Sequence, residues 1–237
     1  MSDEITEDEM NELRALHRLI VRGGGVGGFD KLLSGINKAQ LEGSRPLSGR
    51  ACRLHDDLVL KIKANSPVDV SHLVPTKVLC RPHLYTTATT ANVRGKKVIL
   101  VIAGVGSLDK RSRSYTGFCE DNEGSNFSVT DWFSHVVSHE YGHILEDVFL
   151  DEGEIGKSWI NNGLSYSEGF AFWFNDAITG FRTNIDDVAH SYSTDSKLII
   201  SDALTSTYHA LIRYSSKKGV AKTLKDATKI IKKVARG

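Results

Sequence analysis

The sequence has no long apolar run and few cysteines or prolines. Its 237 residues include three cysteines and four prolines. The longest apolar run, residues 98–105, is of strand length, whereas a membrane-spanning helix needs about 18 or more apolar residues. A secretory signal begins with basic residues before an apolar stretch, but this N-terminus, MSDEITEDEM, is acidic. These absences predict a soluble, cytoplasmic protein without a membrane span.

The cysteines exclude a disulfide framework and a cysteine zinc site. Cys52, Cys80 and Cys119 are isolated, odd in number and form no CxxC pair. We expect inert or buried thiols in a reducing compartment. Apolar residues make up 40% of the chain and the net charge is only +1, values typical of a globular protein. No repeat or Pro-rich linker divides the chain, so a single domain over residues 1–237 is predicted.

The N-terminal region predicts helices at residues 5–21 and 29–40. Between them, Gly23, Gly25 and Gly28 satisfy the pattern GxGxxG. A dinucleotide-binding loop of that pattern follows a strand, and this one follows a predicted helix. We therefore interpret the glycines as a flexible turn.

The period of the sequence changes in the middle of the chain. Alternating or β-branched runs at 58–63, 77–84 and 96–103 predict strands, with a turn signal near Arg94. Residues 104–127 are polar and rich in Gly and Ser, which is typical of a long surface loop. A small mixed, mostly antiparallel sheet is expected.

Helical patterns dominate after this loop, and the whole chain therefore predicts an α+β fold. Residues 1–127 would contain helices and the sheet, and residues 128–237 a helical part beside a shared cleft. The predicted C-terminal helices lie at 130–150, 165–180, 196–216 and 219–235.

The segment His139-Glu140-Tyr141-Gly142-His143 carries the chemistry. Four residues are about one helical turn, so both imidazoles leave the same helix face and can bind one cation. Glu140 is offset by roughly 100° and lies beside the metal, where a general base is needed. Gly142 is a poor helix former and leaves room for a close neighbour. An apolar stripe faces nearly the opposite way: Phe133, Val137, Ile144 and Val148.

Catalytic zinc usually has three protein ligands, and Glu168 is the predicted third. The segment Ser167-Glu168-Gly169-Phe170-Ala171, together with the preceding His-Glu motif, resembles the gluzincin group of metallopeptidases. The resemblance implies a zincin-like fold with Zn²⁺ held by two histidines and a glutamate from a second helix. A chain that turns back through a loop at residues 151–163 and returns antiparallel could bring that helix to the histidines.

Two features leave the role of Glu168 and its surroundings open. Ser165 precedes Glu168 by three residues, so the pair could equally form a capping box at a helix N-terminus. Gluzincins often orient the first histidine with an Asp four residues after the ligand Glu, where this chain has Phe172. Asp147 and Asp176 are alternatives for that role.

Two further metal interpretations follow from the same helix. Metzincins need Gly and His three and six residues after His143, where this chain has Glu146 and Phe149, so that group is excluded. His135 lies on the stripe of His139, and three stacked histidines could bind zinc for a purely structural purpose.

The resemblance implies a peptidase in which Glu140 deprotonates a metal-activated water and then protonates the leaving amine. No segment resembles the exopeptidase motifs that bind a free N-terminus, which slightly favours an endopeptidase. One more donor would stabilise the oxyanion, and the sequence does not choose among five residues. They are His190, Tyr192, Tyr208, His209 and Arg213.

Charge is distributed unevenly along the chain. Residues 217–236 contain eight basic residues and one acid, and residues 120–154 contain ten acids and no Lys or Arg. The basic segment has an apolar stripe, which favours a helix docked on the core with a solvated face over a nucleic-acid-binding one. Besides a peptidase acting on peptide or protein substrates, the alternatives are a noncatalytic zinc-stabilised or degenerate binding module and this nucleic-acid role. The oligomeric state stays open.

Overall fold

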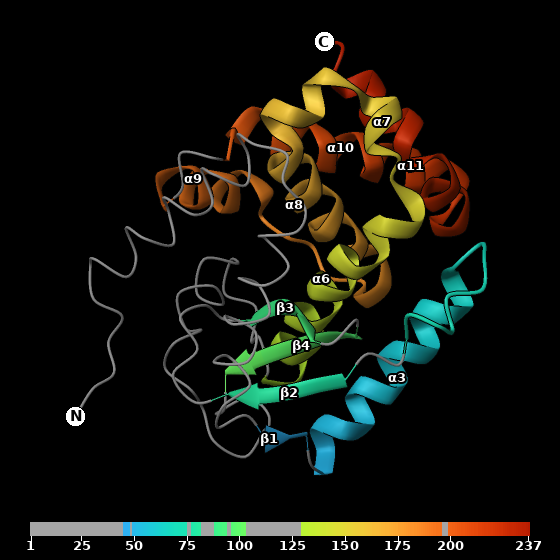
Figure 1. Cartoon of the computed structure of the whole chain (residues 1–237), viewed down its shortest axis with the longest axis vertical. Helices are drawn as coiled ribbons and strands as arrows, with labels where there is room; N and C mark the ends of the chain where they lie inside the picture. Colours follow the sequence, from blue (N-terminus) through green and yellow to red (C-terminus); the bar gives the residue numbers. More distant parts are fainter. Residues whose placement is uncertain are drawn as a thin grey trace.

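The computed structural model describes residues 45–47, 49–74, 77–81, 88–93, 96–102, 129–195 and 199–237. Within them the chain is α+β and mostly helical, as predicted. Figure 1 shows the sheet at one end of the molecule with a helix alongside it, and most other helices at the opposite end. Several predicted features lie outside the described residues: the helices at 5–21 and 29–40, the glycine turn between them, the turn near Arg94 and the loop at 104–127.

The sheet is mixed and has the order β1-β2-β4-β3. β2 runs parallel to β4, whereas β1 pairs with β2 and β3 pairs with β4 in antiparallel fashion. The strands predicted at 77–84 and 96–103 correspond to β2 and β4, and β3 was not predicted. The bounds are Arg45–Pro46 for β1, Lys77–Arg81 for β2, Ala88–Val93 for β3 and Lys96–Ile102 for β4.

The strand predicted at 58–63 is wrong, because this segment lies in the helix α3, Gly49–Asn65. Leu58, Val59 and Ile62 are buried, with 3%, 7% and 1% of their surface exposed, whereas Leu60 is 65% exposed. This burial follows the helical spacing rather than the period of two that the alternating residues suggested.

The C-terminal half is helical, as predicted, with two differences. The loop predicted at 151–163 is wrong: a short helix and the first turns of the next one occupy it, separated by Gly156 at a φ of 78°. The helix α9 was also not predicted. The bounds are Val129–Phe149 for α6, Glu152–Ile155 for α7, Lys157–Thr179 for α8, Ile185–Asp195 for α9, Ser201–Lys218 for α10 and Val220–Val234 for α11.

The core surrounds α6 and α8. The apolar stripe predicted on α6 is buried at Phe133, Val137 and Ile144, which are at 0% exposure, but not at Val148, which is 37% exposed. α6 packs against β3, β4 and α3 on one side and against α8 on the other. α8 contributes the aromatic side chains of Phe170 and Trp173, which are also fully buried. α6 therefore separates the sheet from the remaining helices, and its polar face is directed to α8.

Two predictions from the sequence's absences can be compared with the described residues. None of their helices is long and apolar enough to cross a membrane. Cys52 is a free thiol, but it is exposed rather than buried.

Candidate metal centre

The site forms where α6 and α8 approach closely. A Cβ on Gly142 would lie 2.7 Å from the Cα of Ala171, so the glycine allows the two backbones to touch. A Cβ on Gly169 would lie 2.6 Å from the carbonyl oxygen of Leu204, which brings α10 equally close to the other side of α8. The room expected beside Gly142 is thus filled by α8. His139 and His143 flank Gly142 on α6, and Glu168 lies just before Ala171 on α8.

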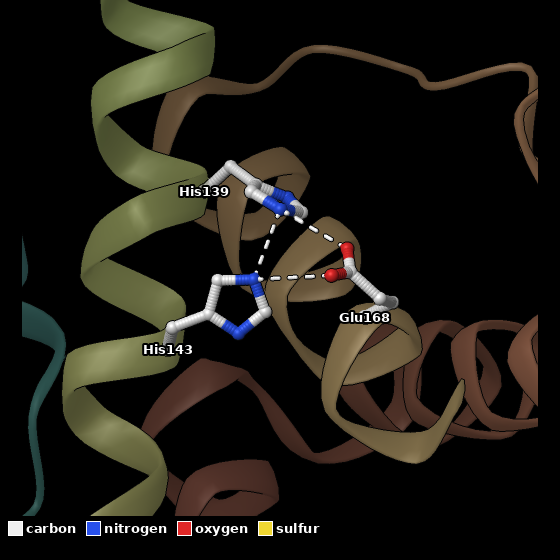
Figure 2. A group of neighbouring side chains, drawn as sticks. All are labelled: His139, His143 and Glu168. Atoms are coloured by element: carbon white, nitrogen blue, oxygen red, sulfur yellow. Dashed lines mark hydrogen bonds and ion pairs between the residues drawn. The ribbon is translucent and has the colours of Figure 1, made fainter. Parts of the chain in front are cut away.

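His139, His143 and Glu168 converge as predicted. Figure 2 shows both imidazoles leaving α6 toward the Glu168 carboxylate on α8. The Nε2 atoms of the two histidines are 3.2 Å apart. The carboxylate oxygens of Glu168 lie 3.3 Å from Nε2 of His139 and 3.6 Å from Nε2 of His143. The three residues can each offer one ligand atom to a shared metal ion.

The donor set fits a divalent metal. Two imidazole nitrogens and one carboxylate oxygen are a ligand set found at catalytic zinc. The Oε2 atom of Glu168 is buried and pairs with Nε2 of His139 at 3.3 Å, but it accepts no well-aligned hydrogen bond among the described residues. Burial disfavours the Glu168 carboxylate, but His143 and His139 outweigh burial and lower its pKa. Buried polar atoms are normally hydrogen-bonded, so an ionised carboxylate oxygen left without such a bond suits a ligand atom.

Glu168 is not a helix cap. α8 begins at Lys157, well before Ser165 and Glu168, so both residues lie inside the helix. The Ser165 hydroxyl instead accepts a hydrogen bond of 2.8 Å from the backbone nitrogen of Ile200. The capping-box alternative is therefore wrong, and Glu168 is free to act as a ligand.

His143 is supported by residues that the sequence analysis did not single out. Its Nδ1 atom lies 2.9 Å from Oε1 of Glu146 and 3.0 Å from the hydroxyl of Ser167. Ser167 donates to the same carboxylate at 2.7 Å. Burial lowers the pKa of His143, but the carboxylates of Glu146 and Glu168 outweigh burial and raise it to about 10. Glu146 lies one turn after His143, and this spacing was the available signal.

His139 has a different environment. Its Nδ1 atom is buried and has no hydrogen-bond partner among the described residues, and the Phe172 ring packs against it at 4.3 Å between centroids. Neither acid proposed to orient His139 lies there. Asp147 is exposed and pairs with Lys97. Asp176 accepts a hydrogen bond of 2.6 Å from the hydroxyl of Tyr208 instead.

Glu140 contacts the sheet and lies close enough to His143 for its charge to contribute to the raised pKa of that histidine. The side chain of Glu140 is buried, and the hydroxyl of Thr90 on β3 donates to its Oε2 atom at 2.8 Å. Glu140 is not a member of the ligand group. Thr90 was not predicted, because a threonine in an unrecognised strand carries no motif.

His135 belongs to a separate polar group. Its Nδ1 atom accepts a hydrogen bond of 2.6 Å from Nδ2 of Asn175, and Ser138 donates to Oδ1 of the same amide at 2.5 Å. Burial, followed by the nearby His139, lowers the pKa of His135 to about 3. Among the described residues His135 is not in a group that could share a metal, which contradicts the three-histidine site.

The five residues considered for the oxyanion lie in different places. Tyr192 packs edge-on against Phe172 with centroids 5.8 Å apart, and Phe172 in turn covers His139. The Tyr208 hydroxyl is bound to Asp176. The other three, His190, His209 and Arg213, are exposed. Of the five, Tyr192 therefore contacts the immediate surroundings of the ligands.

Comparison with known proteins adds no relative: no family model, curated protein or solved structure matches this chain. The site must be judged from its own geometry. That geometry is a largely buried His-His-Glu group able to hold a metal ion, with the buried Glu140 next to His139 on α6.

Proposed function

We propose that the protein is a zinc-dependent peptidase, with His139, His143 and Glu168 as ligands and Glu140 as general base. The observation that carries the proposal is the convergence of the three ligand residues from two helices, with Glu140 next to a ligand but outside their group. A structural zinc site would usually have four protein ligands, whereas a catalytic one has three and an open position.

Zinc is the proposed metal because of the donor types. Imidazole nitrogens with a single carboxylate oxygen suit zinc, whereas calcium and magnesium prefer oxygen ligands alone. When bound, zinc supplies Lewis acidity that polarises a water molecule and the scissile carbonyl. Glu146 and Ser167 hold Nδ1 of His143 and keep its Nε2 atom directed at the site.

The position of Glu140 supports its proposed role as general base. It lies one residue after the ligand His139, and the hydroxyl of Thr90 fixes one of its carboxylate oxygens. The other oxygen remains to take a proton from the attacking water and to deliver it to the leaving nitrogen. A glutamine at this position would keep the shape but could not accept the proton.

A peptide substrate is favoured by the strand beside Glu140. β3 pairs with β4 on one side, and no other described strand pairs with its opposite edge. An extended peptide can add to such an edge through backbone hydrogen bonds. Because Thr90 links β3 to Glu140, a peptide on this edge would pass close to the base. This mode does not need a free substrate N-terminus and therefore favours an endopeptidase.

The gluzincin resemblance and the zincin-like fold belong to the same proposal. The third ligand comes from a second helix, and α8 runs antiparallel to α6, since Ser138 contacts Asn175, Gly142 contacts Ala171 and His143 contacts Ser167. The site departs from the gluzincin pattern at Phe172, a position where gluzincins often have an Asp.

The test combines metal content with activity. We expect one zinc per chain in the wild type, loss of zinc in Glu168→Ala, and retained zinc in Glu140→Gln. Cleavage of a denatured protein substrate should fall at least about hundredfold in Glu140→Gln, since general-base catalysis contributes about 10² to 10⁴. Glu152→Gln, an exposed acid on α7, is the matched control and should behave as wild type. Wild-type protein that binds no zinc would refute the proposal.

A noncatalytic zinc-binding module is the second candidate. One observation favours it: His139 is covered by an aromatic ring rather than oriented by a carboxylate. In that case zinc would bind with the same ligands, but neither the wild type nor Glu140→Gln would cleave the substrate. The metal and activity measurements therefore separate the two functions.

A further inference from the structure

A dense group of basic residues lies on α11, which contributes no residue to the metal centre. Six basic residues of α11 and its C-terminal turn follow one another at intervals of one to four positions. At 3.6 residues per turn they fall within a sector of roughly 100° on one side of the helix. We name this surface the basic stripe: Lys222, Lys225, Lys229, Lys232, Lys233 and Arg236.

The opposite side of α11 is fixed in the core. Leu224, Ala227 and Ile231 are 1%, 0% and 0% exposed. The Thr228 hydroxyl also donates to the carbonyl oxygen of Phe149 at 3.0 Å and ties α11 to the end of α6. Figure 1 shows α11 beside α7 and α10, at the opposite end of the molecule from the sheet. The stripe is therefore presented on a rigid support, and the apolar face is not available to a partner.

Little of the stripe's charge is neutralised within the protein. Lys222 pairs with Asp226 at 2.6 Å, and Lys232 pairs with Glu154 at 3.6 Å. The other four basic residues form no ion pair with a described residue. Asp226 is also bound by the Tyr214 hydroxyl at 2.7 Å, so the one acid of α11 is occupied. Like charges three or four residues apart on a helix repel, and this arrangement would be relieved by a bound polyanion.

We propose that the basic stripe binds the phosphate backbone of nucleic acid without sequence preference. The stripe extends about 16 Å along one side of the helix from Lys222 to Lys233, and such an elongated row of charges matches a linear polyanion. It contains no aromatic or amide side chain able to read bases. A membrane surface is disfavoured, because helices that bind bilayers insert an apolar face, and that face of α11 is buried.

The probe is a fluorescently labelled 20-base-pair DNA duplex, with binding followed by anisotropy at different salt concentrations. With about four phosphate contacts, the affinity of the wild type should fall roughly hundredfold between 50 and 200 mM salt. The variant Lys225→Glu/Lys229→Glu/Lys233→Glu should bind more than about tenfold more weakly and lose about three units of the salt slope. All three positions are exposed, so the fold should be retained. A Lys→Gln version of the same triple change should give a smaller loss.

The matched control is Lys61→Glu/Lys63→Glu/Lys157→Glu, which changes the net charge equally at exposed lysines of α3 and α8. It should keep most of the wild-type affinity. Glu140→Gln and Glu168→Ala should also bind the duplex as wild type does, which separates this role from the peptidase proposal. Three outcomes would overturn the proposal: no binding by wild type at 50 mM salt, equal losses in the two triple variants, or binding to anionic phosphatidylserine vesicles but not to the duplex.

Discussion

Two polar clusters lie next to each other between α6 and α8, and they differ in how fully their atoms are hydrogen-bonded. Both place a histidine of α6 against a polar side chain of α8. His135 and His139 are buried, whereas the side chains of His143 and Glu168 are 21% and 13% exposed. The closed cluster consists of His135, Ser138, Asn175 and Asp176. The ligand cluster consists of His139, His143 and Glu168.

In the closed cluster each side chain has a partner of the complementary kind. The Asn175 amide donates to His135 and to Asp176 and accepts from Ser138. Asp176 also accepts a hydrogen bond of 2.8 Å from the backbone nitrogen of Thr183. None of these side chains has a buried polar atom without a partner, whereas the ligand cluster has two, on His139 and Glu168.

The difference in hydrogen bonding separates a cluster that stabilises the helix pair from one that can bind a metal ion. A satisfied buried network fixes the packing of the helices and needs nothing else. Buried polar atoms without a partner cost free energy, and a metal ion bound by Glu168 would remove this cost at its Oε2 atom. On His139 the atom nearest the other two residues is Nε2, so its unpartnered Nδ1 atom lies outside the ligand group. The comparison predicts that changes in one cluster affect folding and changes in the other affect metal binding.

The largest expected effect comes from adding zinc to the ligand cluster. At free zinc about a thousand times its Kd, the free energy of unfolding should rise by about 4 kcal/mol over protein in EDTA. Urea unfolding followed by circular dichroism measures the difference. Glu168→Ala should lose most of the rise, whereas Asn184→Ala, an exposed asparagine before α9, should keep it. An unchanged midpoint in wild type would remove the distinction between the clusters.

Removing Asn175, the centre of the closed cluster, should lower stability without affecting zinc binding. Asn175→Ala leaves the His135, Ser138 and Asp176 side chains without their common partner, so the free energy of unfolding should fall by about 3 kcal/mol. Zinc stoichiometry should stay at the wild-type value in the folded protein. A stable variant that no longer binds zinc would show that the two clusters are not separable.

Lowering the pH should destabilise the closed cluster, because His135 is held in its neutral form in the folded protein. Its folded-state pKa, about 3, lies below the ordinary 6.5, so between these values the unfolded chain binds a proton that the folded chain excludes. His135 should therefore lower the free energy of unfolding of the metal-free protein as the pH falls, on the order of 2 kcal/mol from pH 7.5 to 5. The raised pKa of His143 acts in the opposite direction, so the His135 contribution is measured as the difference between the wild type and His135→Gln. His135→Gln should show a smaller decrease, and His209→Gln, at an exposed site, should match wild type.

The smallest expected effect concerns the support of His143. Glu146→Gln keeps a hydrogen-bonding group beside Ser167 but removes the negative charge that favours a basic imidazole. Zinc affinity should fall about tenfold, or about 1.4 kcal/mol, in a competition assay with a coloured chelator. Glu152→Gln supplies the control, and equal affinities for both variants would show that Glu146 acts only through its shape.

The ligand cluster could be predicted because its spacing is local. His139 and His143 are one turn apart, and the amphipathic pattern located their helix within one residue at each end. The role of Glu168 could be decided only from the structure, since the same sequence is compatible with a helix cap or a metal ligand. That question depended on where α8 begins, and the start at Lys157 follows a positive-φ glycine that the sequence analysis had placed in a loop.

Other parts could not be predicted, for identifiable reasons. Leu58, Leu60 and Ile62 alternate, which imitates a strand, and only their burial shows the helical period. β3 has the sequence Ala-Thr-Thr-Ala-Asn-Val, which has no large apolar residue to mark it. Thr90 therefore stayed unseen, although it contacts the proposed general base. A contact between residues far apart in the sequence cannot be predicted from the spacing of residues within either segment.

The two close backbone approaches also restrict how this sequence can diverge. Gly142 precedes one ligand and Gly169 follows another, and a side chain at either position would meet a neighbouring helix at less than 3 Å. Distant relatives should therefore preserve the pattern His-Glu-x-Gly-His, followed after 24 residues by Glu-Gly, even where nothing else is recognisable. Two small residues, as much as the three ligands, would be the inherited signature of this site.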